Sequence, residues 1–298
     1  MRYDGDRGEP EIFLKLENLQ PIGSFKLRGA LNRMLALSRD ALSAGVYTAS
    51  AGNMAQGLAY AARALGVSAS VVVPDTAPAA KIEAITRLGA SIVRVPYDEW
   101  WGAMRDHGRQ GMSGVFVHPF ADGQVMAGNG TIGLEILEDL PEVDAILVPW
   151  GGGGLACGIA AAVQAVRPDV RVYGCEVEGS APLRAALAAG APTVIENRRT
   201  FVDGIGGRSV FAEIWPLARQ LVAGSLVVSL DSVAEAVRLL VRRNRIVAEG
   251  AGAAALAAAR SHVIDATPPL RRVACIVSGG NIDAQMLAKI LTGEALSS

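Results

Sequence analysis

The most informative stretch of this chain is AILVPWGGGGLACGIAAAVQAV, residues 145–166. It contains no charged residue and is long enough on paper to cross a bilayer. However, Pro149 and four consecutive glycines lie inside it, and a continuous helix would lose roughly 1 kcal/mol for each Gly and 3 kcal/mol for the Pro. The stretch therefore predicts a buried strand, a turn at residues 151–154 and a buried helix, which together form a βα unit.

Similar units recur from one end of the chain to the other and predict a mainly parallel α/β fold flanked by helices. Strands are expected at residues 12–16, 46–49, 69–73, 91–95, 145–149, 170–177, 225–230 and 273–277. Helices are expected at residues 26–36, 53–65, 79–88, 130–140, 155–166, 232–241 and 252–260. We expect residues 41–117 to form a small α/β domain. If residues 1–40 pack with residues 118–298, the small domain is inserted in a large domain formed by these two segments.

Composition excludes several classes of protein. The formal net charge is −1 and basic and acidic residues are interspersed, which gives no broad basic face for nucleic acid. Cys157, Cys175 and Cys275 form no CxxC pair and lie in apolar surroundings, as expected of small core residues in a reducing compartment. The first residues are polar and acidic, unlike a signal peptide, so we predict a cytoplasmic protein with no membrane partner.

The glycine run at residues 151–154 predicts a phosphate site, because backbone N–H groups at a helix start attract anions. Glycine also lets the backbone approach a ligand closely. Two other interpretations remain open on this motif alone. The spacing Gly151-x-Gly153-x-x-Ala156, with Glu176 at the end of the next strand, also fits a dinucleotide-binding fingerprint, and the run can be a structural turn only.

Lys26 follows Ser24 and Phe25 at the start of an amphipathic helix. Most lysines in such places are simply solvated. Here the neighbours are apolar, and a lysine that is partly desolvated near a positive helix end has its pKa lowered from about 10.4. A lowered pKa favours the neutral, nucleophilic amine that Schiff-base formation requires.

Two Ser-x-Gly-Asn segments follow expected strands, at residues 50–53 and 278–281. In the first, the hydroxyl, amides and carboxamide can bind a carboxylate and a phenolic oxygen. Capping of the following helix is the structural alternative, and the two roles are compatible.

These motifs, with the run LKLENLQPIGSFKLRGA at residues 14–30, resemble the fold-type II pyridoxal-phosphate enzymes, within them the threonine/serine dehydratase and serine racemase branch. The resemblance covers nearly the whole chain and disfavours a dinucleotide. It implies a two-lobed fold like that of the tryptophan synthase β subunit, with residues 1–40 and 118–298 as the cofactor-binding domain. It also implies pyridoxal 5'-phosphate as cofactor and a homodimer.

The resemblance assigns roles by position. Lys26 is expected to form the Schiff base and to act as the catalytic base, with Phe25 against the cofactor ring. Asn53 is expected to bond the ring hydroxyl, and Ser278 the pyridine nitrogen. The phosphate-binding residues are then Gly151, Gly152, Gly153, Gly154 and Leu155. Gly204 and Glu249 match positions near the cofactor, and the substrate carboxylate is assigned to Ser50, Ala51, Gly52 and Asn53.

The chain departs from the family pattern at two places. Met54 stands where His is frequent in the family, so we expect the substrate pocket to differ from that of such relatives. Some relatives bind a divalent cation at positions that match Glu176, Ser180 and Pro182 here; because proline supplies no carboxylate, no metal site is expected. The chain also ends soon after Ser278, so no appended regulatory domain is expected.

The expected reaction is β-elimination from L-threonine, L-serine or a related β-hydroxy amino acid, giving a 2-oxo acid and ammonia. A hydroxyl facing the pyridine nitrogen is a weak acid, which disfavours a long-lived carbanion and favours loss of the β-hydroxyl. Serine racemisation is the first alternative, although relatives of that type carry Ser where this chain has Ala51. A β-replacement synthase and a non-catalytic cofactor-binding protein are the others.

Overall fold

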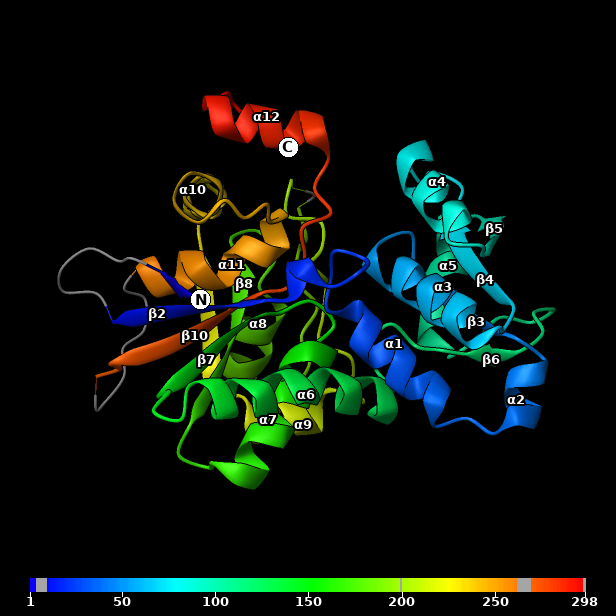
Figure 1. The fold of residues 1–298 in the computed structure, drawn as a ribbon, viewed down its shortest axis with the longest axis horizontal. Coiled ribbons are helices and arrows are strands. Elements are labelled where there is room, and N and C mark those ends of the chain that lie inside the picture. The colour runs from blue at the N-terminus through cyan, green and yellow to red at the C-terminus, as the bar shows by residue number, and fades with distance from the viewer. Residues whose placement is uncertain (4–9, 199, 262–268, 297–298) are drawn as a thin grey trace. The chain divides into compact units, whose positions relative to one another are not determined.

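The computed structural model describes residues 1–3, 10–198, 200–261 and 269–296 (Figure 1). The chain divides into two compact units. The larger unit comprises residues Met1–Leu19 and Gly130–Ser298, and the smaller unit comprises Gln20–Asn129.

The larger unit contains a six-stranded sheet in the order β1-β2-β10-β7-β8-β9. Strand β1 is antiparallel to β2, and every other neighbouring pair is parallel. Strand β7 is buried along its whole length, as an apolar run covered on both faces should be. The strands are β1 (Arg2–Tyr3), β2 (Glu11–Leu16), β7 (Ala145–Pro149), β8 (Arg171–Val177), β9 (Gly224–Val228) and β10 (Arg272–Val277).

Helices cover both faces of this sheet. Figure 1 shows α10 (Leu230–Leu239) and α11 (Gly250–Arg260) on one side, with α7 (Gly154–Val166) and α9 (Trp215–Leu221) on the other. Residues 250–259 of α11 are all buried, since their small side chains let the helix approach the sheet closely on one side and α10 on the other. The unit also contains η1 (Glu17–Leu19), α8 (Pro182–Ala189), the π-helical turn η2 (Leu240–Asn244) and α12 (Ala284–Thr292).

The smaller unit contains a four-stranded, fully parallel sheet in the order β5-β4-β3-β6. Its strands are β3 (Val46–Ala49), β4 (Ala69–Pro74), β5 (Ser91–Val95) and β6 (Val115–Phe116). Its helices are α1 (Lys26–Leu35), α2 (Arg39–Ser43), α3 (Asn53–Leu65), α4 (Ala79–Arg87) and α5 (Tyr97–Arg105). The parallel α/β class expected from the sequence is confirmed in both units.

The borders of the units differ from the expected domain borders. Residues 20–40 and 118–129, which the sequence analysis assigns to the large domain, pack within the smaller unit. The reason is that Ala30 and Met34 of α1 share a buried core with Leu58 of α3. Helix α6 (Gly123–Asp139) runs across the border between residues 129 and 130.

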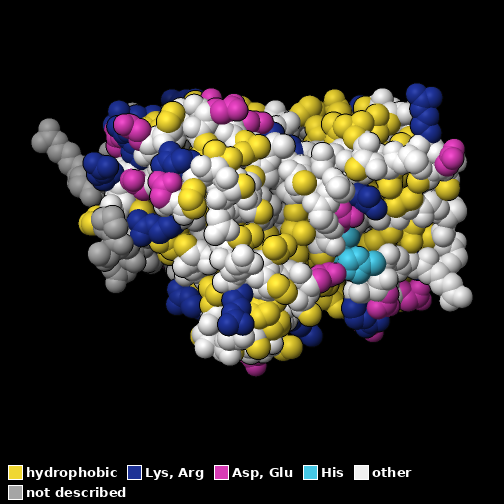
Figure 2. Space-filling model, turned by 90° about the horizontal axis from the view of Figure 1, so that it is seen from below, with side chains coloured by type: hydrophobic (Ala, Val, Ile, Leu, Met, Phe, Trp, Pro, Cys, Tyr) yellow, Lys and Arg dark blue, Asp and Glu magenta, His cyan; other side chains and the backbone are white. Residues whose placement is uncertain are grey.

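No helix among the described residues combines the length and apolar character needed to cross a membrane. On the face drawn in Figure 2, basic and acidic side chains are interspersed, with no continuous basic area. The three cysteines are buried and free, as the sequence predicts.

Candidate functional site

Lys26 begins helix α1 in the smaller unit. Its backbone N–H contacts Ser24 Oγ at 3.4 Å, and its Nζ donates a hydrogen bond of 2.5 Å to the carbonyl oxygen of Pro119. Nζ also lies 5.1 Å from the centre of the Phe25 ring. Burial lowers the pKa of the Lys26 amine to about 8, so a substantial fraction is neutral near that pH. The lowered pKa expected from the apolar neighbours is therefore present.

A bend at residues 119–120 supplies the acceptor for Lys26. The His118 side chain is 1% exposed, and its Nδ1 accepts backbone N–H bonds from Phe120 (3.2 Å) and Ala121 (2.8 Å). Its Nε2 lies 3.1 Å from the carbonyl oxygen of Met104. Pro119 lies between His118 and Phe120, which are joined by the hydrogen bond to Nδ1. The histidine therefore fixes the segment that carries the Pro119 carbonyl.

The loop at residues 50–53 joins β3 to α3 in the same unit. Ser50 Oγ accepts the N–H of Gly52 at 3.2 Å, and Asn53 is the first residue of α3. Gly57, one turn further on the same face as Asn53, packs on the start of α1: a Cβ there would lie 3.0 Å from the Lys26 carbonyl. The structure thus places the start of α1 against the first turns of α3.

The glycine turn at residues 151–154 joins β7 to α7 in the larger unit. Gly153 has φ +89°, and a Cβ there would meet Ile214 Cγ2 at 2.6 Å and the Trp150 ring at 2.8 Å. Both its conformation and the space around it therefore require glycine. The turn ends at Gly154, where the amide groups of the first turn of α7 point outward along the helix axis.

Three further predicted residues lie near this turn in the larger unit. A Cβ on Gly151 would lie 3.4 Å from the Gly204 carbonyl, and one on Gly204 would lie 3.4 Å from Glu249 Oε1. The N–H of Glu249 bonds the carbonyl of Gly279 at 3.0 Å, next to the buried Ser278. Because β7 and β10 are parallel neighbours, the turns that follow them leave the same edge of the sheet.

The Glu176 side chain is buried and surrounded by hydrogen-bond donors. Its carboxylate accepts the N–H groups of Leu183 (2.7 Å) and Arg184 (2.9 Å) at the start of α8 and the hydroxyl of Ser225 (2.5 Å). Burial raises its pKa, while these three bonds act in the opposite direction. The carboxylate therefore caps a helix.

The predicted site residues fall into two groups, each close together in its own unit. Phe25, Lys26 and residues 50–53 belong to the smaller unit; residues 151–155, Gly204, Glu249 and Ser278 belong to the larger one. Met54, which the sequence analysis connects with the pocket, is 2% exposed and part of the core. His118 is a residue that sequence reasoning missed; its one visible signal is a histidine directly before the Pro-Phe-Ala-Asp segment.

Comparison with known proteins agrees with this geometry. A family model described as "Pyridoxal-phosphate dependent enzyme" matches residues 2–279. The chain is 41% identical over 284 residues to an L-threonine ammonia-lyase of Thermotoga maritima, covering 94% of this chain and 70% of that protein. It is 38% identical over 290 residues to the catabolic L-threonine dehydratase TdcB of Escherichia coli, covering 97% and 88%. The structure of maize serine racemase superposes with a TM-score of 0.86 at 32% identity, covering 95% of this chain and 87% of that one.

Proposed function

The chain belongs to the family of pyridoxal-phosphate dependent enzymes, and we propose that it is an ammonia-lyase that removes water and ammonia from L-threonine, L-serine or a related β-hydroxy amino acid. The observation that carries this proposal is the state of Lys26: its amine is hydrogen-bonded at 2.5 Å and burial lowers its pKa to about 8. An amine of this kind is a competent nucleophile and base near neutral pH.

The residues present fit the cofactor. The glycine turn at residues 151–154 has one left-handed residue, Gly153, and no side chains, so its amide groups can surround a phosphate. The residues that we propose to line the cofactor ring offer an aromatic face and polar groups: Phe25, Asn53, Gly204, Glu249 and Ser278. Lys26 is the residue that we propose to bind the aldehyde.

When bound, pyridoxal phosphate supplies the electron sink that makes the Cα–H bond of an amino acid acidic. Lys26 Nζ then takes the Cα proton as general base, since at pH 8 about half of such amines are neutral. The Pro119 carbonyl accepts a hydrogen bond from Nζ and so holds the amine in one orientation. The Ser50 hydroxyl and the amide groups of residues 51–53 bind the substrate carboxylate and so fix which Cα bond faces the amine. The β-hydroxyl leaves as water with the proton that Lys26 took from Cα. Hydrolysis of the unsaturated amine that remains takes up one water and yields a 2-oxo acid and ammonia.

The test is a measurement of ammonia and 2-oxo acid released from L-threonine, L-serine, 3-hydroxyaspartate and phenylserine, together with borohydride reduction and peptide mapping. We expect the reduced cofactor on Lys26 and at least one rapidly consumed β-hydroxy amino acid. A Lys26→Ala variant that retains full turnover would refute the role given to Lys26.

Serine racemisation is the second candidate, supported by the likeness to maize serine racemase. Racemisation needs an acid that delivers a proton to the face opposite Lys26. Ala51 offers no such group at the position where racemase-type relatives carry Ser. D-serine forming faster than pyruvate from L-serine would reverse this ranking.

Two further proposals concern the cell and the assembly. The buried, unpaired cysteines support a reducing compartment and hence the cytoplasm. The family resemblance supports a homodimer. Sedimentation equilibrium of the holoenzyme tests the second proposal, and a monomer at all concentrations would reject it.

A further inference from the structure

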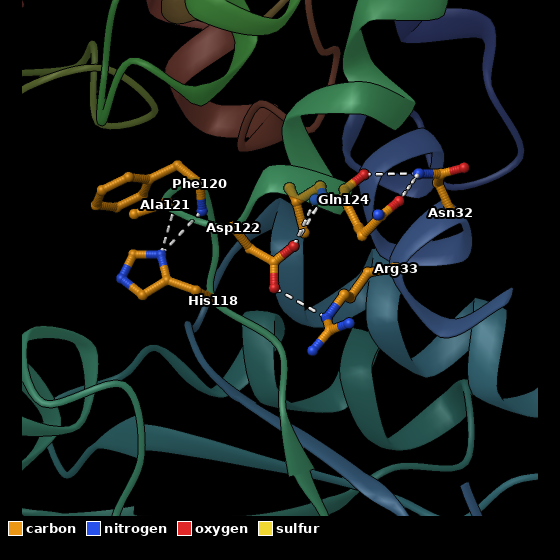
Figure 3. Close-up of polar contacts among 8 residues, drawn as sticks. Asn32, Arg33, His118, Phe120, Ala121, Asp122 and Gln124 are labelled. Atoms are coloured by element: carbon orange, nitrogen blue, oxygen red, sulfur yellow. Dashed lines mark hydrogen bonds and ion pairs between the residues drawn. The ribbon is translucent and has the colours of Figure 1, made fainter. Parts of the chain in front are cut away.

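The His118 ring is held in one tautomer by three backbone groups of the smaller unit. Figure 3 shows its Nδ1 accepting from the N–H groups of Phe120 and Ala121. A nitrogen that accepts two N–H bonds carries no proton, so the ring proton is on Nε2, which donates to the Met104 carbonyl at 3.1 Å. Three directed bonds on one ring fix both its position and its plane.

The link from His118 to Lys26 passes through a single peptide group. The Phe120 N–H and the Pro119 C=O belong to the same planar trans peptide, and they point in opposite directions. His118 Nδ1 bonds the N–H side of that plane at 3.2 Å. Lys26 Nζ bonds the C=O side at 2.5 Å. Rotation of this plane would break both bonds together.

We propose that His118 is a positioning residue that orients the Pro119–Phe120 peptide so that its carbonyl holds the Lys26 amine in place. The inference rests on the proposed role of Lys26 and deepens it: an imidazole sets the direction of the amine through the peptide group that lies between them.

The far end of the same segment is fixed independently. Asp122 Oδ1 accepts the N–H groups of Gln124 (2.8 Å) and Val125 (3.1 Å) at the start of α6, and Oδ2 forms an ion pair of 2.9 Å with Arg33 Nε (Figure 3). Arg33 belongs to α1, the helix that Lys26 begins. The segment is therefore tied to α1 at one end, and His118 determines the orientation of the peptide nearer the amine.

A purely structural role for His118 makes a different prediction. The ring packs with Phe116, Phe120 and His107, with ring centres at 5.9, 4.6 and 4.6 Å. If filling this space were its function, an apolar side chain of similar size would replace it, and any loss would be one of global stability. The bonds to the peptide plane predict a local loss at Lys26 instead.

The chain makes this loss measurable because it has only four lysines: Lys15, Lys26, Lys81 and Lys289. We label lysine with carbon-13 at the ε position and record NMR spectra of the cofactor-free protein, in which each lysine gives one signal. The signal that disappears in Lys26→Arg belongs to Lys26. Relaxation of the ε carbon reports how strongly the amine is held. We expect the Lys26 signal of the wild-type protein to be the most ordered of the four.

Four variants separate the two roles. His118→Leu removes all three bonds, and His118→Gln, which retains polarity should Leu prevent folding, cannot offer the same acceptor to Phe120. His118→Asn places an oxygen near the position of Nδ1 and should restore order. Val117→Ala truncates a neighbouring side chain that is 0% exposed and serves as the matched control for lost stability.

We expect His118→Leu and His118→Gln to mobilise the Lys26 ε carbon while the other three lysines keep their relaxation, and Val117→Ala to leave Lys26 ordered at a similar loss of thermal stability. In the holoenzyme, His118→Leu should lower kcat roughly ten- to a hundredfold with little change in KM, because the amine is misdirected while substrate contacts remain. A wild-type Lys26 signal in His118→Leu, or an equal loss of order in Val117→Ala, would overturn the proposal. The relaxation result does not depend on turnover, so absence of ammonia release would count against the proposed function alone.

Discussion

Arg33 and Asp122 form a half-buried ion pair in the smaller unit, with Nε and Oδ2 2.9 Å apart, and the same carboxylate caps helix α6. Asp122→Ala removes both interactions, and Asp122→Asn removes the charge while keeping an oxygen for the cap. We expect Asp122→Ala to lower the free energy of unfolding, measured in urea, by about 2–3 kcal/mol, and Asp122→Asn to lower it by about 1 kcal/mol. Asp106, which pairs with Arg105 on the surface, is the control, and Asp106→Asn should leave stability unchanged. Equal losses at Asp122 and Asp106 would contradict this ranking.

Acid stability should depend on His118. Burial, with smaller effects from His107 and Lys26, lowers the pKa of His118 from 6.5 to about 3. Between these values the unfolded chain binds a proton that the folded chain does not, so stability falls as the pH falls from 6.5 towards 3, by on the order of 1.4 kcal/mol per pH unit. Urea unfolding at pH 7, 6 and 5 should show this slope in the wild-type protein and a shallower one in His118→Asn. Parallel slopes would show that His118 does not titrate as inferred.

The Lys26 amine predicts a dependence of the same sign at alkaline pH. Because its pKa is lowered from 10.5 to about 8, the folded cofactor-free protein binds fewer protons than the unfolded chain between those values. Its stability should therefore rise with pH from 8 to 10.5, by at most about 3 kcal/mol. In Lys26→Met this rise should disappear. The comparison is made by denaturant unfolding of both proteins without cofactor, and identical curves would count against a desolvated amine.

Gly153 should tolerate no side chain. Alanine there combines the strain of φ +89° with contacts to Ile214 and Trp150 under 3 Å. We expect Gly153→Ala to lose about 2–4 kcal/mol of stability and to bind pyridoxal phosphate at least tenfold more weakly, followed by cofactor fluorescence. Gly190→Ala is the matched control, since Gly190 has φ +70° and open space around it. It should lose about 1 kcal/mol and keep full cofactor affinity.

Glu176 should act as a helix cap. Its oxygens already accept from Leu183, Arg184 and Ser225, so Glu176→Gln replaces one acceptor by an amide that faces other donors. We expect a loss of about 2–3 kcal/mol in thermal or urea unfolding. Treatment with EDTA should leave the melting temperature and the rate of ammonia release unchanged. A fall in both that Mg²⁺ or Ca²⁺ reverses would instead identify a cation site.

Sequence alone predicts the elements in which propensity, periodicity and turn residues agree. The strand, glycine turn and helix at residues 145–166 are found as β7, the turn and α7, with borders within one residue of those expected. Helix α3 and strands β3 and β5 have the expected borders. In β3, α3, β7 and α7, apolar residues bury one face or the whole element, and a glycine or proline marks an end of each of these elements and of β5.

Elsewhere tertiary packing overrides local signals. Helix α5 was not expected, because Pro96 suggests only the end of a strand; yet Pro96 precedes its first turn, and Asp98 and Glu99 there favour a helix start. Helix α6 begins seven residues before the expected residue 130, since its glycines weaken the helical pattern. Gly128 lets α6 pack closely on α1, since a Cβ on Gly128 would lie 2.5 Å from the Arg28 carbonyl. Helices α2, α8, α9 and α12 are short and were also missed.

The candidate site divides in the same way. Lys26, residues 50–53 and residues 151–154 stand at borders between predicted elements, so sequence motifs make them visible, and their roles toward the cofactor stay predictions. His118 could not be found, because its importance lies in bonds to backbone groups that any sequence possesses. A single histidine in an apolar segment has the same pattern whether it fills space or orients a peptide.

Gly252 on the fully buried helix α11 has a consequence for how the enzyme can be altered. A Cβ at this position would collide with the Gly279 carbonyl, directly beside Ser278. The smallest side chain therefore sets how near the helix comes to the strand end that carries the serine. One added methyl group would push the segment that carries Ser278 away from the helix. Redesign of this enzyme for new substrates therefore has to start from the loops and leave this helix unchanged.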